Sequence, residues 1–125
     1  MNFVQYKDIK PLTEAPTEDK VLIDVREPNE VIQGSIPSSY NLPLSKFEHA
    51  LDLDDAEFKN LYGFNNPASG NDHKRDSIFF CLSGKRAAIA CDLATKRGIK
   101  NIHNYQGSYA DWLANEQARE QKALD

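Results

Sequence analysis

The sequence predicts an α/β domain with a mostly parallel central sheet flanked by helices, and two observations carry that prediction. Residues 21–25 and 77–81 form short, almost continuous apolar runs rich in β-branched or aromatic residues, which is typical of strands buried on both faces. Helical patterns lie between and after these runs, and buried strands joined by helices are typical of parallel sheets. Ligands of such sheets bind at the carboxyl ends of the strands.

The other predicted elements are a weaker strand and four helices. We expect the strand at residues 101–105 and the helices at residues 27–32, 54–62, 84–97 and from 108 onward. Gly63 and Gly98 stand where the second and third helices end. The Ser108 hydroxyl is expected to cap the last helix, with Asp111 three residues on, and Trp112 is expected to be buried.

The chain is predicted to form one domain. Its 125 residues suffice for one ordinary core and are too few for two independent ones. We therefore assign residues 1–125 to a single domain, with a core at about 20–113 and a polar helix end at 114–125. The polar stretch 65–73 is predicted to be a surface loop within that domain.

Composition and charge exclude several classes of protein. The net charge of −4 argues against nucleic acid as a partner, because phosphate binding needs a basic face. No apolar run is long enough to span a membrane. The two cysteines, Cys81 and Cys91, make no disulfide framework, which favours a reducing compartment. The N-terminal residues resemble neither a secretory signal nor a transit peptide, so we expect a cytoplasmic protein, or a mitochondrial one if a presequence is missing.

The chemistry of the sequence concentrates where the second apolar run ends. Cys81 ends the predicted strand, a loop containing Gly84 follows, and a helix begins. Backbone N–H groups of such a turn converge on one point, and the helix N-terminus adds positive potential there. Together with Lys85 and Arg86, these features lower the pKa of a thiol and attract an anionic substrate. The residues alone leave a second interpretation open, in which Cys81 is an inert buried side chain.

Four segments resemble the rhodanese-like sulfurtransferases. Residues 81–86 (CLSGKR) resemble that family's active-site loop, with cysteine first and a basic residue sixth. Residues 24–27 with Glu30 resemble its D-V-R-x-x-x-E segment. Residues 34–43 resemble its G-H-I-P-x-[AS]-x-N-x-P stretch, and residues 105–112 resemble Y-x-G-G-x-x-x-W. The four motifs occur in the family's order over most of the chain, and the insertion around residues 58–64 is similar to the eukaryotic thiosulfate:glutathione branch.

The resemblance implies a rhodanese-like domain in which Cys81 carries sulfur as a persulfide. It implies thiosulfate as a small-molecule donor and a glutathione-like thiol or cyanide as acceptor, with a protein acceptor also open, and it implies no metal or other cofactor. The substrate-binding residues that it implies are those of the loop: Leu82, Ser83, Gly84, Lys85 and Arg86. Two positions depart from the family. Ser35 replaces a frequent His and Ser108 a frequent Gly, which bears on substrate range and loop packing.

Two other functions compete with sulfur transfer. Cysteine-dependent phosphatases and arsenate reductases have an active-site signature that resembles C-x5-R. In this chain only four residues separate Cys81 from Arg86, and this spacing argues against that class of enzyme. A catalytically silent binding module is disfavoured because the cysteine and both loop cations are present. Structural roles are expected for Cys91, which packs in the core, and for Arg26, which pairs with Glu30 at i,i+4 spacing. His49, His73 and His103 show no metal-ligand spacing.

Overall fold

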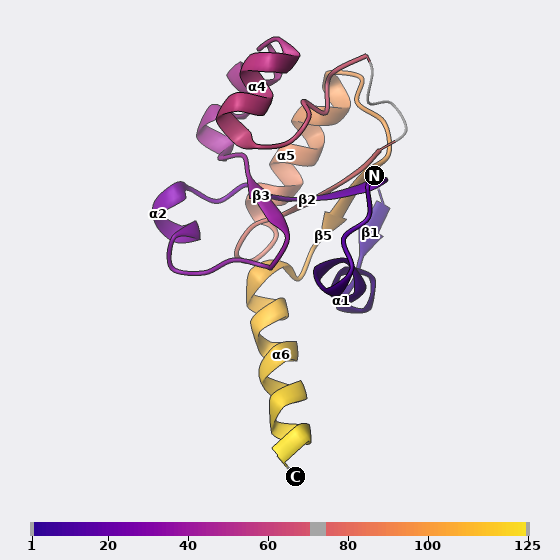
Figure 1. Cartoon of the computed structure of the whole chain (residues 1–125), viewed down its shortest axis with the longest axis vertical. Coiled ribbons are helices and arrows are strands. Elements are labelled where there is room, and N and C mark those ends of the chain that lie inside the picture. The colour runs from indigo at the N-terminus through magenta and orange to yellow at the C-terminus, as the bar shows by residue number, and fades with distance from the viewer. Residues whose placement is uncertain (1, 71–74, 125) are drawn as a thin grey trace.

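The computed structural model describes residues 2–70 and 75–124 and shows one five-stranded sheet in which every neighbouring pair is parallel (Figure 1). The strand order is β1-β5-β4-β2-β3. The strands are β1 (Asn2–Val4), β2 (Lys20–Asp24), β3 (Ser39–Asn41), β4 (Asp76–Phe80) and β5 (Ile102–Tyr105). The predicted α/β class with a parallel sheet is confirmed.

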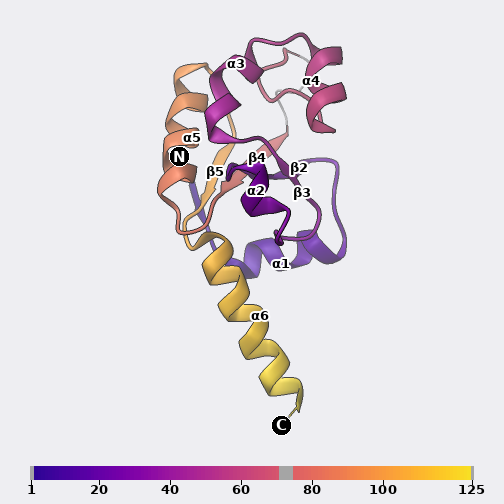
Figure 2. The same ribbon diagram turned by 90° about the vertical axis from the view of Figure 1, so that its left-hand side faces the viewer.

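Helices cover both faces of this sheet. They are α1 (Tyr6–Glu14), α2 (Pro28–Val31), α3 (Phe47–Leu51), α4 (Asp55–Tyr62), α5 (Lys85–Lys96) and α6 (Ser108–Leu124), with a 3₁₀ turn at Leu44–Lys46. Figure 2 shows α3, α4 and α5 on one side of the strands and α1 and α6 on the other. The sheet therefore separates two apolar cores.

Alternation along the central strands fills both cores. Val21, Ile23 and Phe79 point to the α3–α5 side, whereas Ile78 and Phe80 point to the α1–α6 side. Successive side chains of a strand point to opposite faces, so a strand buried on both faces must be apolar at every position. This explains the two continuous runs from which the strands were predicted.

Most predicted elements are confirmed. The runs at 21–25, 77–81 and 101–105 correspond to β2, β4 and β5, and the four predicted helices correspond to α2, α4, α5 and α6. Gly63 ends α4 in the left-handed conformation, with φ of 84°. Trp112 is buried as expected, and α5 packs on the sheet through a face of small side chains: Ala87, Ala90, Cys91 and Ala94.

The N-terminal segment belongs to the core, although the predicted core begins only at about residue 20. β1 pairs with β5 at the sheet edge, and Ile9 and Leu12 of α1 pack with Trp112. The sequence did not predict these two elements, because β1 has only three residues and α1 contains Pro11. The hydrophobic periodicity of this segment is therefore weak.

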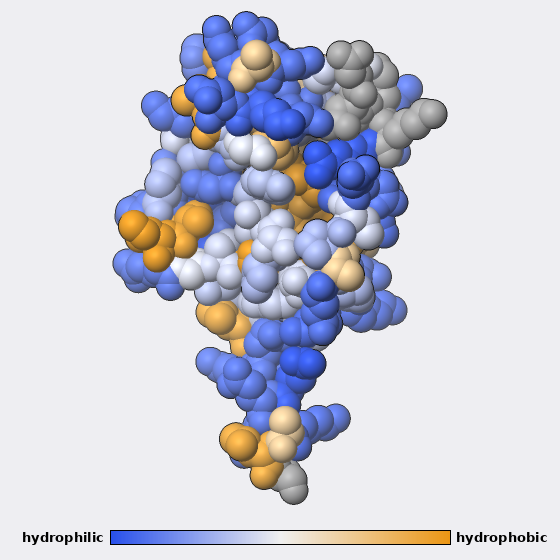
Figure 3. Space-filling model, viewed as in Figure 1, coloured by the Kyte–Doolittle hydropathy of each residue, from blue (hydrophilic) through white to orange (hydrophobic). Residues whose placement is uncertain are grey.

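The polar C-terminal end continues α6 away from the body of the domain (Figure 1). Figure 3 shows a mostly hydrophilic face on which the apolar areas are small and separate, one of them over α2 and one at the end of α6. No helix in the described ranges is long and apolar enough to cross a membrane. The predicted loop at 65–73 is a turn region up to residue 70, and residues 71–73 lie outside the described residues.

Replacing Ile9 by Ala tests the contribution of α1. Ile9 is 0% exposed and Ile32 is 86% exposed, so Ile32→Ala is a matched control with the same loss of atoms. We expect Ile9→Ala to lower the free energy of unfolding by about 2–5 kcal/mol, because it leaves a cavity in the core. Ile32→Ala is expected to change it by less than about 0.5 kcal/mol. Urea unfolding followed by circular dichroism measures both, and equal midpoints would contradict the packing of α1.

Candidate active site

The turn after β4 has a backbone shape that only glycine allows. Cys81 lies one residue beyond β4, and Gly84 precedes α5 with a positive φ of 101°. A Cβ atom on Gly84 would lie 2.4 Å from the carbonyl oxygen of Gln106. The chain therefore turns into α5 in direct contact with the backbone that follows β5.

The N–H groups of this turn point at the sulfur of Cys81. Gly84 N donates to Sγ at 3.0 Å and Ala87 N at 3.4 Å. Cys81 is only 1% exposed, and this burial raises the pKa of its thiol. Hydrogen bonds from the N–H groups of Ala87, Gly84 and Ser83 outweigh burial, so the pKa of Cys81 lies below its ordinary value. This is the direction that the sequence predicts.

The carbonyl groups of the same turn are held by the start of α6. Tyr109 N donates to Cys81 O at 2.9 Å, and Ala110 N donates to Leu82 O at 3.0 Å. The first N–H groups of a helix have no partner within the helix, so they are free to bind these carbonyls. With the carbonyls turned toward α6, the loop N–H groups remain available to the sulfur.

Ser108 connects the turn after β4 to the end of β5. Its predicted role as helix cap is wrong. Its hydroxyl accepts a hydrogen bond from Cys81 N at 3.0 Å, donates to Tyr105 O at 2.8 Å and lies 3.9 Å from Cys81 Sγ. Asp111 N donates instead to Gly107 O. The φ of Ser108 is +60°, a conformation that favours glycine, which accounts for the frequent Gly at this position in the resembled motif.

The two loop cations differ in their surroundings. Arg86 forms a two-pronged ion pair with Glu30 of α2, at 2.6 and 2.9 Å, and Arg86 lowers the pKa of Glu30 to about 2. Lys85 is exposed, as are Leu82 and Ser83. The sequence did not identify Glu30 as a partner of the loop.

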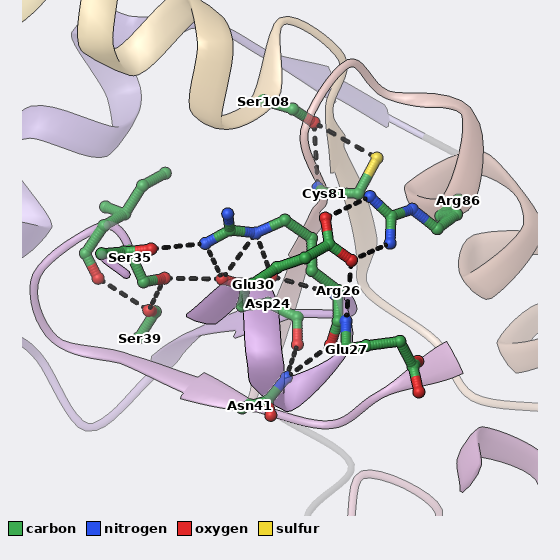
Figure 4. Close-up of polar contacts among 12 residues, drawn as sticks. Asp24, Arg26, Glu27, Glu30, Ser35, Ser39, Asn41, Cys81, Arg86 and Ser108 are labelled. Atoms are coloured by element: carbon green, nitrogen blue, oxygen red, sulfur yellow. Dashed lines mark hydrogen bonds and ion pairs between the residues drawn. The ribbon is translucent and has the colours of Figure 1, made fainter. Parts of the chain in front are cut away.

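The predicted pair between Arg26 and Glu30 is wrong. Arg26 binds Asp24, with Nη2 at 2.8 Å from Oδ2, and Glu30 binds Arg86 (Figure 4). Arg26 precedes the first residue of α2, so the i,i+4 rule for helices does not apply to it.

Asp24 is the centre of a buried polar network beside the loop. It is 0% exposed and accepts hydrogen bonds from Arg26 N, from the Arg26 guanidinium and from Ser35 Oγ at 2.6 Å. Ser35, at the position of the family's frequent His, therefore serves as a donor to Asp24. The guanidinium of Arg26 also stacks on the ring of Tyr109, with 4.4 Å between the carbon Cζ and the ring centroid.

The second cysteine lies in a different environment. Cys91 of α5 is buried in the core, as predicted, and its burial raises the pKa of the thiol to about 12. Within residues 2–70 and 75–124, no group of three or more His, Cys, Asp or Glu is placed to hold a metal ion. His73, one of the three histidines, is outside the described residues.

Comparison with known proteins agrees with the geometry of this site. The family model described as rhodanese-like domain matches residues 8–115. A putative mitochondrial thiosulfate sulfurtransferase of Schizosaccharomyces pombe is 44% identical over 114 residues, which cover 90% of this chain and 78% of the relative. The human thiosulfate:glutathione sulfurtransferase is 39% identical over 95 residues, covering 76% of this chain and 80% of the relative.

Solved structures lead to the same family. A single-domain sulfurtransferase of Saccharomyces cerevisiae superposes with a TM-score of 0.80 at 35% identity, covering 94% of this chain and 92% of that one. The human single-domain sulfurtransferase superposes with a TM-score of 0.77 at 33% identity, covering 91% and 96%. The chain belongs to the rhodanese-like family and is a sulfurtransferase of that family.

Proposed function

We propose that this enzyme transfers the outer sulfur of thiosulfate to an acceptor thiol such as glutathione, or to cyanide, through a persulfide on Cys81. One observation carries the proposal. The Sγ atom of Cys81 accepts backbone hydrogen bonds at the start of α5, and these lower the pKa of its thiol. The names of the relatives support the donor and the thiol acceptor.

In the first half-reaction, the Cys81 thiolate attacks the outer sulfur of thiosulfate. A bond forms between Sγ and that sulfur, the sulfur–sulfur bond of thiosulfate breaks, and sulfite leaves with the bonding electron pair. The thiolate starts the reaction, so the backbone hydrogen bonds that lower the pKa of Cys81 increase the fraction of reactive enzyme.

In the second half-reaction, an acceptor thiolate attacks the outer sulfur of the Cys81 persulfide. The new bond forms on the acceptor, the bond to Sγ breaks, and Cys81 returns to the thiolate. The N–H groups of Ser83, Gly84 and Ala87 lower the energy of negative charge on Cys81 at both ends of the cycle. No net oxidation takes place, so the two steps balance without a redox partner.

We assign different roles to the loop cations. Lys85 is exposed and no ion pair is recorded for it among the described residues, so it offers positive charge to thiosulfate and departing sulfite. The guanidinium of Arg86 is occupied by Glu30 and adds less net charge. Leu82 and Ser83 form the exposed edge of the substrate site, and Gly84 supplies the nearest N–H group.

The compartment is proposed to be the cytoplasm, or the mitochondrion if a presequence precedes residue 1. The names of two relatives, from S. pombe and S. cerevisiae, state a mitochondrial location. Imaging of the full-length protein with a fluorescent tag at its C-terminus separates these two locations.

Treatment with thiosulfate tests the proposed carrier. We expect intact-mass measurement to show a gain of one sulfur atom per chain, which glutathione removes with release of its persulfide. Cys81→Ala is expected to abolish both the gain and thiosulfate consumption, because no other described thiol has a lowered pKa. Cys91→Ala is the matched control and is expected to keep the label. Normal turnover by Cys81→Ala would refute the mechanism.

A second prediction concerns the glycine at the turn. Gly84→Ala places a Cβ against the Gln106 carbonyl and displaces the N–H that binds Sγ, whereas Gly98, also at positive φ, has no atom near its Cβ position. We therefore expect Gly84→Ala to lower kcat by about 10²–10³-fold, as when an oxyanion donor is lost. It should also shift the pH midpoint of Cys81 alkylation by iodoacetamide upward, since weaker hydrogen bonding raises the pKa.

Gly98→Ala is the matched control for backbone strain. It carries the same conformational penalty at positive φ but lies away from the sulfur, so the alkylation midpoint is expected to stay at the wild-type value. In the wild type this midpoint should lie below that of free cysteine. An identical midpoint in both glycine variants would show that the turn does not set the pKa of Cys81.

A further inference from the structure

A groove of about 500 Å³ opens beside the catalytic turn, between α2 and the first turns of α6. Leu82, which directly follows Cys81, lies in its wall. The other lining residues used below are Arg26, Asn29, Glu30, Gln33, Gly34, Tyr109 and Leu113. The groove therefore combines two charged side chains, two amide side chains and an apolar surface, and it reaches the catalytic turn at Leu82.

Arg26 has one donor group that no described residue uses. Its Nε and Nη2 atoms bind Asp24, and Nη2 also binds the Gly34 carbonyl at 2.8 Å. Nη1 has no hydrogen-bond partner within residues 2–70 and 75–124, and Figure 4 shows it without a dashed line. Because the guanidinium is planar and its Nε side faces Asp24, Nη1 points away from that carboxylate.

This free donor is fixed in position and open to a ligand. Arg26 is only 4% exposed, but its Nη1 atom is not fully buried. Because Arg26 lines the groove, a ligand in the groove can reach Nη1. Asp24 and the ring of Tyr109 hold the guanidinium on two sides. A charged donor that is held in place loses little conformational freedom when it binds an anion.

We propose that this groove is the subsite for the acceptor thiol, and that Arg26 Nη1 binds a carboxylate of that acceptor. The inference rests on the proposed function and adds to it a residue that determines acceptor specificity: Arg26 favours small peptide-like thiols that carry a carboxylate over thiols that do not. The amides of Asn29 and Gln33 suit the peptide groups of such a molecule, and Leu82, Tyr109 and Leu113 suit its methylene groups.

The position of the groove suits transfer from Cys81. β2 and β4 are neighbours in the sheet, with Asp24 opposite Phe80, so Arg26 and Cys81 follow the carboxyl ends of strands that lie about 4.8 Å apart. An acceptor held by its carboxylate at Arg26 therefore has its thiol beside the catalytic turn. Asp24 offsets the charge of Arg26 as Arg86 offsets that of Glu30, so Nη1 contributes as a directed hydrogen-bond donor, and Glu30 does not repel a carboxylate strongly.

Two thiols that differ in a carboxylate test this inference: mercaptopropionate and mercaptoethanol. The measured quantity is the ratio of their kcat/KM values as acceptors, which cancels any effect of a variant on persulfide formation. Arg26→Lys keeps the charge beside Asp24 but removes the fork that carries Nη1. We expect it to lower the ratio by about 10-fold or more, as for loss of a hydrogen bond to a charged group.

Arg97→Lys is the matched control, because Arg97 also pairs with an aspartate, Asp52, but does not line the groove. It is expected to keep the wild-type ratio. A wild-type ratio in Arg26→Lys, with circular dichroism showing a folded protein, would overturn the assignment.

A binding measurement on the wild type covers the case in which Arg26→Lys fails to fold. S-methylglutathione has the carboxylates and peptide groups of glutathione but no free thiol. In amide NMR titrations we expect it to shift the resonances of Gly34, Leu82 and Tyr109 more than those of α4. Shifts elsewhere, or none at millimolar concentration, would overturn the proposal. This measurement needs no turnover. Specific binding without thiosulfate consumption would therefore refute the proposed function, and with it the role as acceptor subsite, while showing that the groove binds a carboxylate-bearing peptide.

Discussion

The orientation of three peptide groups between Cys81 and Gly84 is the constraint on which the site depends. The N–H groups of Ser83 and Gly84 donate to Sγ. Two of the carbonyls of these peptide groups, those of Cys81 and Leu82, accept hydrogen bonds from the first N–H groups of α6. The same contact brings Gln106 so close to Gly84 that a side chain cannot fit between them. The active turn is therefore built from two chain segments, and the helix after β5 is as important for it as the helix after β4.

This construction explains how a buried thiol keeps a lowered pKa. Removing Cys81 from water raises its pKa, and a strand-end cysteine without donors would remain protonated, as Cys91 does. At Cys81, fixed N–H dipoles replace the lost water. They are already oriented in the resting enzyme, so the thiolate forms without reorganisation of the surroundings.

The charged side chains around the turn are arranged in two layers. Asp24 and Arg26 form a buried pair, whose desolvation is compensated by additional hydrogen bonds from Ser35 and from backbone groups. Glu30 and Arg86 form a more exposed pair that connects α2 to α5. Each pair uses most of its hydrogen-bonding groups internally, and Arg26 Nη1 and Arg86 Nε are the guanidinium nitrogens of the two pairs that have no partner among the described residues. Lys85 belongs to neither pair, so it and Arg26 Nη1 are the donors to which we assign ligand binding.

The sequence was sufficient for the elements whose own residues determine them. β2 and β4 were predictable because burial on both faces makes every position apolar. The end of α5 was predictable because Gly98, shortly after its last residue, is a local stop signal. β1 and α1 were missed because a three-residue edge strand and a helix containing Pro11 have no strong period. The place of β1 is determined by pairing with β5, about a hundred residues later in the chain, and that of α1 by packing against Trp112 of α6.

The same distinction separates what was predicted at the site from what was not. Cys81 and its loop were recognisable because nucleophile, glycine and helix start are consecutive in the chain. The roles of Ser108 and Glu30 were not, because each acts on a residue far away in sequence, 27 positions for Ser108 to Cys81 and 56 for Glu30 to Arg86. The i,i+4 spacing of helices predicted Arg26 as the partner of Glu30, but Arg26 lies outside α2 and binds Asp24. That binding leaves Nη1 as the one donor of Arg26 with no partner among the described residues, so the correction to the predicted ion pair is also the basis for the acceptor subsite.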